Sequence, residues 1–165
     1  MSNEIKILSR KQISQKILRL SWEIYENNFD EKELVIVGVG EKGFLLAEEL
    51  SNNLSKISSI SSLLIRLDVN SNKSSDKSTV LSEKDYKNKV IILVDDVLYS
   101  GKTLMYACKR FLNTSVKKMS VLVLIDRNHN SYPIKADYVG VSLSTTLKEY
   151  IKVILLGKNQ GVYLS

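Results

Sequence analysis

Apolar residues recur at helical spacing near the start of the chain. They lie at Ile13, Ile17, Leu20 and Ile24. This spacing places one apolar stripe along a helix, so we predict an amphipathic helix over Arg10–Asn27. Ser9 stands where an N-cap is expected, and Gln12, three residues later, completes a capping box.

Shorter apolar runs separated by polar segments predict strands. Their ranges are 5–8, 34–37, 63–67, 90–94, 120–125, 138–143 and 150–156. The run 90–94 is continuously apolar, which is typical of a central parallel strand buried on both faces. We predict a turn at 38–43 and further helices at 44–54 and 103–112. Residues 162–164 are expected to close the sheet. Because strands alternate with helices, the chain is predicted to be an α/β domain with a mainly parallel sheet.

Length and composition indicate one ordinary globular domain spanning 1–165. The chain has 165 residues, of which 44% are apolar, and a single proline. No apolar run approaches the roughly 18 residues needed to span a bilayer, and the charged N-terminus does not resemble a signal peptide. Cys108 is the only cysteine, which excludes an internal disulfide and a multi-cysteine metal site. We therefore expect a cytoplasmic protein without a membrane partner.

The formal net charge of +6 suits an anionic partner, either a phosphorylated small molecule or RNA. Ligands of open parallel sheets bind beyond the carboxyl ends of the strands. The loops that begin at Gly38, Asp68, Asp95 and Asp126 are therefore expected to line the site. The segment 70–79 has no apolar residue and is typical of a lid or a linker.

Two segments are candidates for phosphate binding. The first, Gly38 to Gly43, has the spacing GxGxxG of a dinucleotide-binding turn, whose supporting acid is expected about 20 residues further on. Asp68 follows Gly43 by 25 residues, which is late for that role. A Rossmann-type dinucleotide binder and a plain glycine turn both remain open alternatives for this segment.

The second candidate is the segment 90–103, which reads VIILVDDVLYSGKT. Its end resembles a Walker A motif, but Asp96 stands where that motif requires its first glycine. Two carboxylates at a strand end can accept hydrogen bonds from vicinal sugar hydroxyls and lie beside Mg²⁺. The following helix start, with the Ser100 and Thr103 hydroxyls, can hold a phosphate. One loop thus offers both features that a ribose 5-phosphate requires.

The string VIILVDDVLYSGKT resembles the phosphoribosyl pyrophosphate (PRPP) motif of type I phosphoribosyltransferases, in particular the PyrR family. That family comprises pyrimidine operon attenuators with uracil phosphoribosyltransferase activity. The resemblance extends to three further segments, RLSWEIYENN at 19–28, LVLIDRNH at 122–129 and YPIKADYVG at 132–140. It implies a type I phosphoribosyltransferase fold, in which helices flank a twisted parallel sheet and a small hood is added.

The resemblance also implies a role for each matching residue. The PRPP-binding residues would be Asp95, Asp96, Val97, Leu98, Tyr99, Ser100, Gly101, Lys102 and Thr103, together with Glu41, Lys42 and Gly43 as the pyrophosphate loop. The base would lie near Arg127, Thr145 and Thr146. The catalytic residues would be Asp95, Asp96 and Lys73, of which Lys73 belongs to a lid over 68–83. The cofactor would be Mg²⁺, with Asp95 as its ligand.

The implied reaction is transfer of ribose 5-phosphate from PRPP to a nucleobase, uracil in this family, which gives UMP and pyrophosphate. The implied assembly is a homodimer or homotetramer. An alternative is a non-catalytic regulator that senses nucleotides. This alternative depends on the pyrophosphate loop, which reads Glu41-Lys42-Gly43 where the family has Thr-Arg-Gly, and on the lid residues 72–75.

RNA is a further possible partner of such a regulator. Arg19, His129 and Lys135 are the side chains that the sequence leaves for RNA contacts. Four other positions carry residues unlike the hydroxyl, imidazole or cation that the family places there. They are Leu18, Trp22, Asn130 and Val141.

Overall fold

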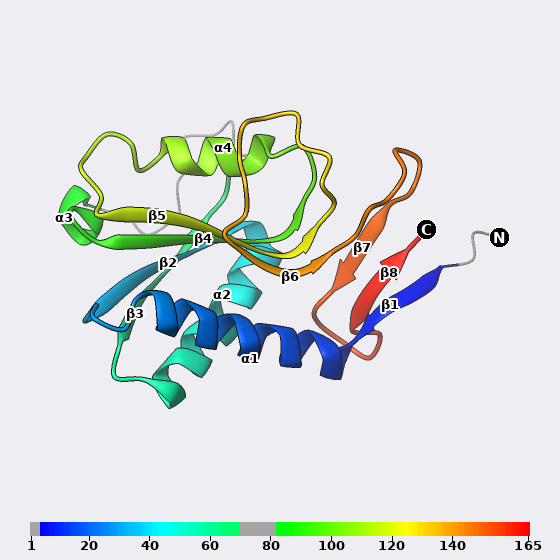
Figure 1. Ribbon diagram of the computed structural model, residues 1–165, viewed down its shortest axis with the longest axis horizontal. Coiled ribbons are helices and arrows are strands. Elements are labelled where there is room, and N and C mark those ends of the chain that lie inside the picture. The colour runs from blue at the N-terminus through cyan, green and yellow to red at the C-terminus, as the bar shows by residue number, and fades with distance from the viewer. Residues whose placement is uncertain (1–3, 70–81) are drawn as a thin grey trace.

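The computed structural model describes residues 4–69 and 82–165, and its centre is a five-stranded parallel sheet (Figure 1). The sheet order is β3-β2-β4-β5-β6, and every neighbouring pair is parallel. In that order the strands are β3 (Ser61–Leu67), β2 (Glu33–Val39), β4 (Val90–Leu98), β5 (Lys118–Asp126) and β6 (Tyr138–Ser142). The predicted α/β architecture with a parallel sheet is confirmed.

The two faces of the sheet are covered by different helices. Helices α1 (Arg10–Asn27) and α2 (Gly40–Ile57) lie on one face, and α4 (Lys102–Lys109) lies on the other (Figure 1). The short helix α3 (Glu83–Tyr86) joins the α4 side, where the Tyr86 ring packs edge-on against Phe111.

Successive residues of the central strands belong to separate cores. On β4, Ile92 packs with the α1 and α2 residues, whereas Ile91 and Leu93 pack with Leu104 of α4. All five residues of the run 90–94 are buried. This explains why the run is apolar throughout instead of alternating with polar residues.

The predicted first helix is confirmed with its cap. The Ser9 hydroxyl accepts a hydrogen bond from the Gln12 N–H at 3.3 Å, and the Gln12 side chain accepts one from the Ser9 N–H at 2.9 Å. None of the described helices is long and apolar enough to cross a membrane. Cys108 is a free, half-buried cysteine on α4, and burial raises the pKa of its thiol.

The chain ends form a second, smaller sheet that is separate from the first. Strands β1 (Ile5–Ser9), β8 (Gly161–Leu164) and β7 (Ile151–Ile154) pair antiparallel in the order β1-β8-β7. The expectation that 162–164 closes the parallel sheet is therefore wrong. Ile5 pairs with Leu164, so the last strand finds its partner at the other end of the chain (Figure 1). We call this three-stranded sheet the hood.

The predicted turn at 38–43 is also wrong, because α2 begins at Gly40, directly after β2. Gly40 has a φ of +68°, a left-handed conformation that glycine adopts without a steric penalty. Strand β4 continues past the apolar run to Leu98, so Asp95 and Asp96 are strand residues rather than loop residues. The predicted catalytic Lys73 and most of the predicted lid lie outside the described residues.

The capping box yields a stability prediction. We expect Ser9→Ala to lower the free energy of unfolding by about 1 kcal/mol, because the Gln12 N–H loses its acceptor. Ser14→Ala is the matched control, since Ser14 lies inside the same helix without a capping role, and we expect a change within about 0.5 kcal/mol. Urea denaturation of both variants measures the difference. Equal losses would contradict a contribution from the cap.

Candidate active site

A cavity of about 460 Å³ lies beyond the carboxyl ends of β2, β3 and β4. Its lining residues are Val39, Gly40, Glu41, Lys42, Asp68, Val69, Asp95, Asp96, Val97, Tyr99 and Thr103. Three of the four predicted loops thus meet at one cavity. The loop after β5 contributes no lining residue, and the Asp126 carboxylate accepts the Asn128 N–H at 2.9 Å instead.

Two neighbouring carboxyl groups, Asp95 and Asp96, lie in the last four residues of β4 and line the cavity. The Asp95 side chain accepts the Asp96 N–H at 2.9 Å. Burial raises the pKa of Asp95 well above its ordinary value, and the adjacent Asp96 adds to this shift. A bound cation or a set of sugar hydroxyls would favour the ionised form of such a carboxyl. The pair therefore fits a polyhydroxyl ligand that is accompanied by a cation.

The first turn of α2 faces the same carboxylates. The Lys42 ammonium lies 3.6 Å from an Asp96 carboxylate oxygen, and Glu41 lines the same cavity. Gly43 is not a lining residue. A Cβ atom there would lie 2.5 Å from the Val94 carbonyl oxygen, so Gly43 allows α2 to approach β4 closely. Of the predicted pyrophosphate loop, two residues thus face the cavity and one has a packing role.

The turn between β4 and α4 is closed by Gly101, whose φ is +86°. The Ser100 hydroxyl accepts a hydrogen bond from the Lys102 N–H at 3.2 Å and so stabilises the first turn of α4. Thr103 and Tyr99 line the cavity, whereas Leu98 is buried in the core on the α4 side. The predicted phosphate segment therefore contacts the cavity with some of its side chains and the core with others.

The structure brings together the three residues expected near the base, but none of them lines the cavity. The Arg127 guanidinium donates to the Thr145 hydroxyl at 2.7 Å and to the Thr146 carbonyl oxygen at 3.0 Å. It also lies over the Tyr99 ring, at 4.7 Å from the centroid. Tyr150, which stacks on Tyr99, was missed from sequence, because no spacing relates two residues so far apart in the chain.

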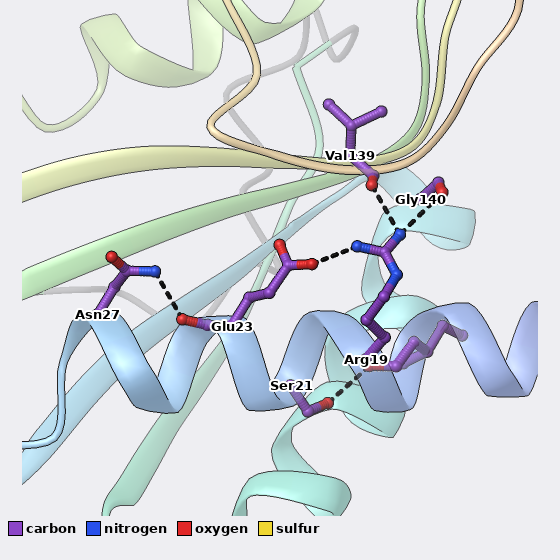
Figure 2. Close-up of polar contacts among 7 residues, drawn as sticks. Arg19, Ser21, Glu23, Asn27, Val139 and Gly140 are labelled. Atoms are coloured by element: carbon purple, nitrogen blue, oxygen red, sulfur yellow. Dashed lines mark hydrogen bonds and ion pairs between the residues drawn. The ribbon is translucent and has the colours of Figure 1, made fainter.

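Two of the three side chains expected to be available for RNA are engaged within the chain. The Arg19 guanidinium donates to the carbonyl oxygens of Val139 at 3.0 Å and Gly140 at 2.9 Å, and it pairs with Glu23 (Figure 2). His129 contacts the Thr145 carbonyl oxygen through Nε2. Arg19 therefore joins α1 to β6 instead of presenting all its donors to solvent.

Residues 5–154 match the phosphoribosyl transferase domain family. The chain belongs to the PyrR-like type I phosphoribosyltransferase family. It is 35% identical over 167 residues to the bifunctional protein PyrR of Clostridium acetobutylicum, a match that covers 95% of this chain and 93% of that protein. It is 36% identical over 159 residues to the bifunctional protein PyrR of Caldicellulosiruptor bescii, with 91% and 87% covered.

Solved phosphoribosyltransferase structures share the fold. The hypoxanthine phosphoribosyltransferase of Trypanosoma cruzi superposes with a TM-score of 0.78 at 14% identity, covering 96% of this chain and 94% of that one. A hypoxanthine-guanine phosphoribosyltransferase of Bacillus anthracis, with HEPES in its active site, gives a TM-score of 0.70 at 22% identity, with 90% and 87% covered. At these identities the likeness concerns the fold, and the predicted type I phosphoribosyltransferase fold is confirmed.

The conformation of Gly101 yields a second stability prediction. We expect Gly101→Ala to lower the free energy of unfolding by about 2 to 4 kcal/mol, because a Cβ atom there adds a clash to the left-handed strain. That Cβ would lie 2.3 Å from the Ile134 side chain. Gly157→Ala is the matched control, since Gly157 has a φ of +84° and nothing within 4 Å of the added atom. We expect the control to lose only the strain, about 1 kcal/mol.

Chemical denaturation of the two alanine variants separates the clash from the strain. Equal losses for Gly101→Ala and Gly157→Ala would mean that Ile134 moves aside at no cost. In that case the short distance to the Ile134 side chain would not explain the glycine at the start of α4.

Proposed function

We propose that this protein transfers ribose 5-phosphate from PRPP to a nucleobase, with uracil as the acceptor. One observation carries the proposal. The carboxyl groups of Asp95 and Asp96, near the end of β4, face the same cavity as the first turns of α2 and α4. Sugar hydroxyls suit the carboxylates, and phosphate groups suit the helix starts. The choice of uracil rests on the resemblance to the PyrR family.

The proposed reaction is a displacement at C1 of the ribose. The bond from C1 to the pyrophosphate oxygen breaks, and pyrophosphate leaves with the electron pair. A ring nitrogen of uracil forms the new bond to C1 and loses its proton. Positive charge develops on the sugar in the transition state, and the carboxylates of Asp95 and Asp96 would stabilise it. Lys42 would balance part of the charge on the departing pyrophosphate.

The family implies Mg²⁺, and the donor set at the end of β4 fits it. Carboxylate oxygens are suitable ligands, and Mg²⁺ is often held by one or two carboxylates together with substrate phosphates. In the part of the chain that the structure describes, no group of three or more His, Cys, Asp or Glu side chains converges on one point. Asp95 and Asp96 would hold the ion with PRPP, and when bound it would neutralise charge on the leaving pyrophosphate.

Calorimetric titration with PRPP and Mg²⁺ tests the proposal. We expect the wild type to bind, and we expect Asp95→Asn/Asp96→Asn to weaken binding by about a hundredfold or more, because charge-assisted hydrogen bonds to the ribose are lost. Asp30→Asn is the control, since Asp30 is exposed and precedes β2 at the opposite end of the sheet. A radiometric assay with uracil and hypoxanthine then identifies the acceptor. No binding by the wild type would refute a PRPP site.

A non-catalytic nucleotide sensor is the second candidate. It is favoured by the Glu41 carboxylate, which lines the cavity beside Lys42. A carboxylate at this position disfavours pyrophosphate but leaves the ribose and 5-phosphate contacts intact. Titration with UMP distinguishes the candidates. Binding of UMP together with failure to bind PRPP would favour the sensor.

The Glu41 carboxylate supplies a further prediction. We expect Glu41→Gln to tighten PRPP binding by about fivefold, since the removed repulsion is about 1 kcal/mol for a solvated site. Glu48→Gln removes the same charge from an exposed position of α2 that does not line the cavity, and we expect no change in the dissociation constant. Titration of both variants with PRPP and Mg²⁺ measures the effect. If both variants match the wild type, Glu41 points away from the pyrophosphate.

A further inference from the structure

Arg127 is the most extensively bonded buried cation among the described residues. Only 8% of its surface is exposed. Its Nε atom donates to the Thr145 hydroxyl at 2.7 Å, and one terminal nitrogen donates to the carbonyl oxygens of Thr146 at 3.0 Å and Glu149 at 2.8 Å. All three acceptors belong to the segment 143–150, which we call the 143–150 loop. The loop links β6 to β7 of the hood.

The flat face of the same guanidinium is also in contact. It lies over the Tyr99 ring at 4.7 Å from the centroid, and the Tyr150 ring stacks on Tyr99 at 6.2 Å. The Tyr99 hydroxyl donates to the Ile151 carbonyl oxygen at 2.7 Å. Tyr99 lines the cavity beyond β4, so Arg127 and Tyr150 connect the cavity wall to the hood.

The ends of the 143–150 loop are held by main-chain hydrogen bonds. The Leu143 N–H donates to the Asp126 carbonyl oxygen at 2.8 Å, and Tyr150 exchanges two such bonds with Ser165. Between these ends, Leu147 is 89% exposed and Lys148 is exposed. The contacts of Arg127 therefore lie in the part of the loop that the two strands do not hold.

We propose that Arg127 is a positioning residue, which holds the 143–150 loop against Tyr99 so that the loop and Tyr99 together bound the side of the site that receives the base. The loop uses three of the five N–H donors of Arg127, so we infer that Arg127 acts on the base through the loop rather than by direct contact. The expectation that the base lies near Arg127 stays a prediction. The inference about the base rests on the proposed function, whereas the inference about the loop does not.

Hydrogen exchange on the ligand-free protein tests the loop. We expect Arg127→Gln to speed exchange of the 143–150 amides by about tenfold, because three hydrogen bonds and the stacked face are lost. We expect Arg127→Lys to behave in the same way. An ammonium keeps the charge but lacks the planar set of N–H donors with which the guanidinium reaches the loop. Arg19→Gln is the matched control, because Arg19 also donates to two main-chain carbonyl oxygens, on β6 (Figure 2). Its exchange in the loop should match the wild type.

Steady-state kinetics with PRPP and uracil then separates positioning from direct contact. We expect both Arg127 variants to raise the KM for uracil by about tenfold, with a change below about threefold in the dissociation constant for PRPP. If Arg127→Gln raises this KM while loop exchange stays at the wild-type rate, Arg127 contacts the base and the proposal is wrong. If Arg127→Lys restores activity, charge rather than geometry is what matters, and the proposal is also wrong.

A second pair of variants keeps Arg127 intact and covers the case in which its replacement prevents folding. Tyr150→Ala removes the ring that stacks on Tyr99, and we expect faster exchange of the loop amides. Tyr150→Phe keeps the ring and should exchange like the wild type. Equal exchange in these two variants would overturn the role of the stack. Should the wild type bind no PRPP, the proposed function fails while the exchange results still decide the positioning role.

Discussion

Strand β4 lies at the centre of the parallel sheet, between β2 and β5, and its first five residues are buried. Burial on both faces keeps this strand in the interior, because any displacement toward the surface would expose apolar side chains to water. The carboxyl end of β4 is therefore a fixed point. The two carboxyl groups near this end, and the first turns of α2 and α4, are all positioned relative to this strand.

The cost of that arrangement is electrostatic. Asp95, beside Asp96, has a raised pKa because it is largely withdrawn from water, and the Lys42 ammonium lies 3.6 Å from Asp96. Such a site is unfavourable without a partner and becomes favourable when positive charge or hydroxyl donors arrive. Perturbed carboxyl groups of this kind are frequent at functional sites. Here they lie where the phosphoribosyltransferase fold is expected to act.

The hood adds a second constraint, because Ile151 of the hood accepts a hydrogen bond from Tyr99, which lines the cavity. Its strands come from the two ends of the chain, and the 143–150 loop joins it to β6. The contacts of Arg127 and Tyr150 with Tyr99 connect this loop to the end of β4. Residues that are far apart in sequence thus contact one another around Tyr99. A substitution at one of them is expected to displace the others.

Periodicity and local chemistry along the chain were by themselves enough to determine several parts of this protein. The helix Arg10–Asn27 with its capping box, the buried strand at 90–94 and the DDVLYSGKT segment all follow from residues close together in the chain. Only the tertiary structure decided which strand pairs with which, since an apolar run carries no record of its partner, and 162–164 pairs with β1 in the hood. The tertiary structure likewise decided the contacts of Arg127, because a guanidinium can bind a ligand or a loop equally well. Which of the two it binds depends on the acceptors that folding brings within about 3 Å of it, and these lie about twenty residues away in the chain.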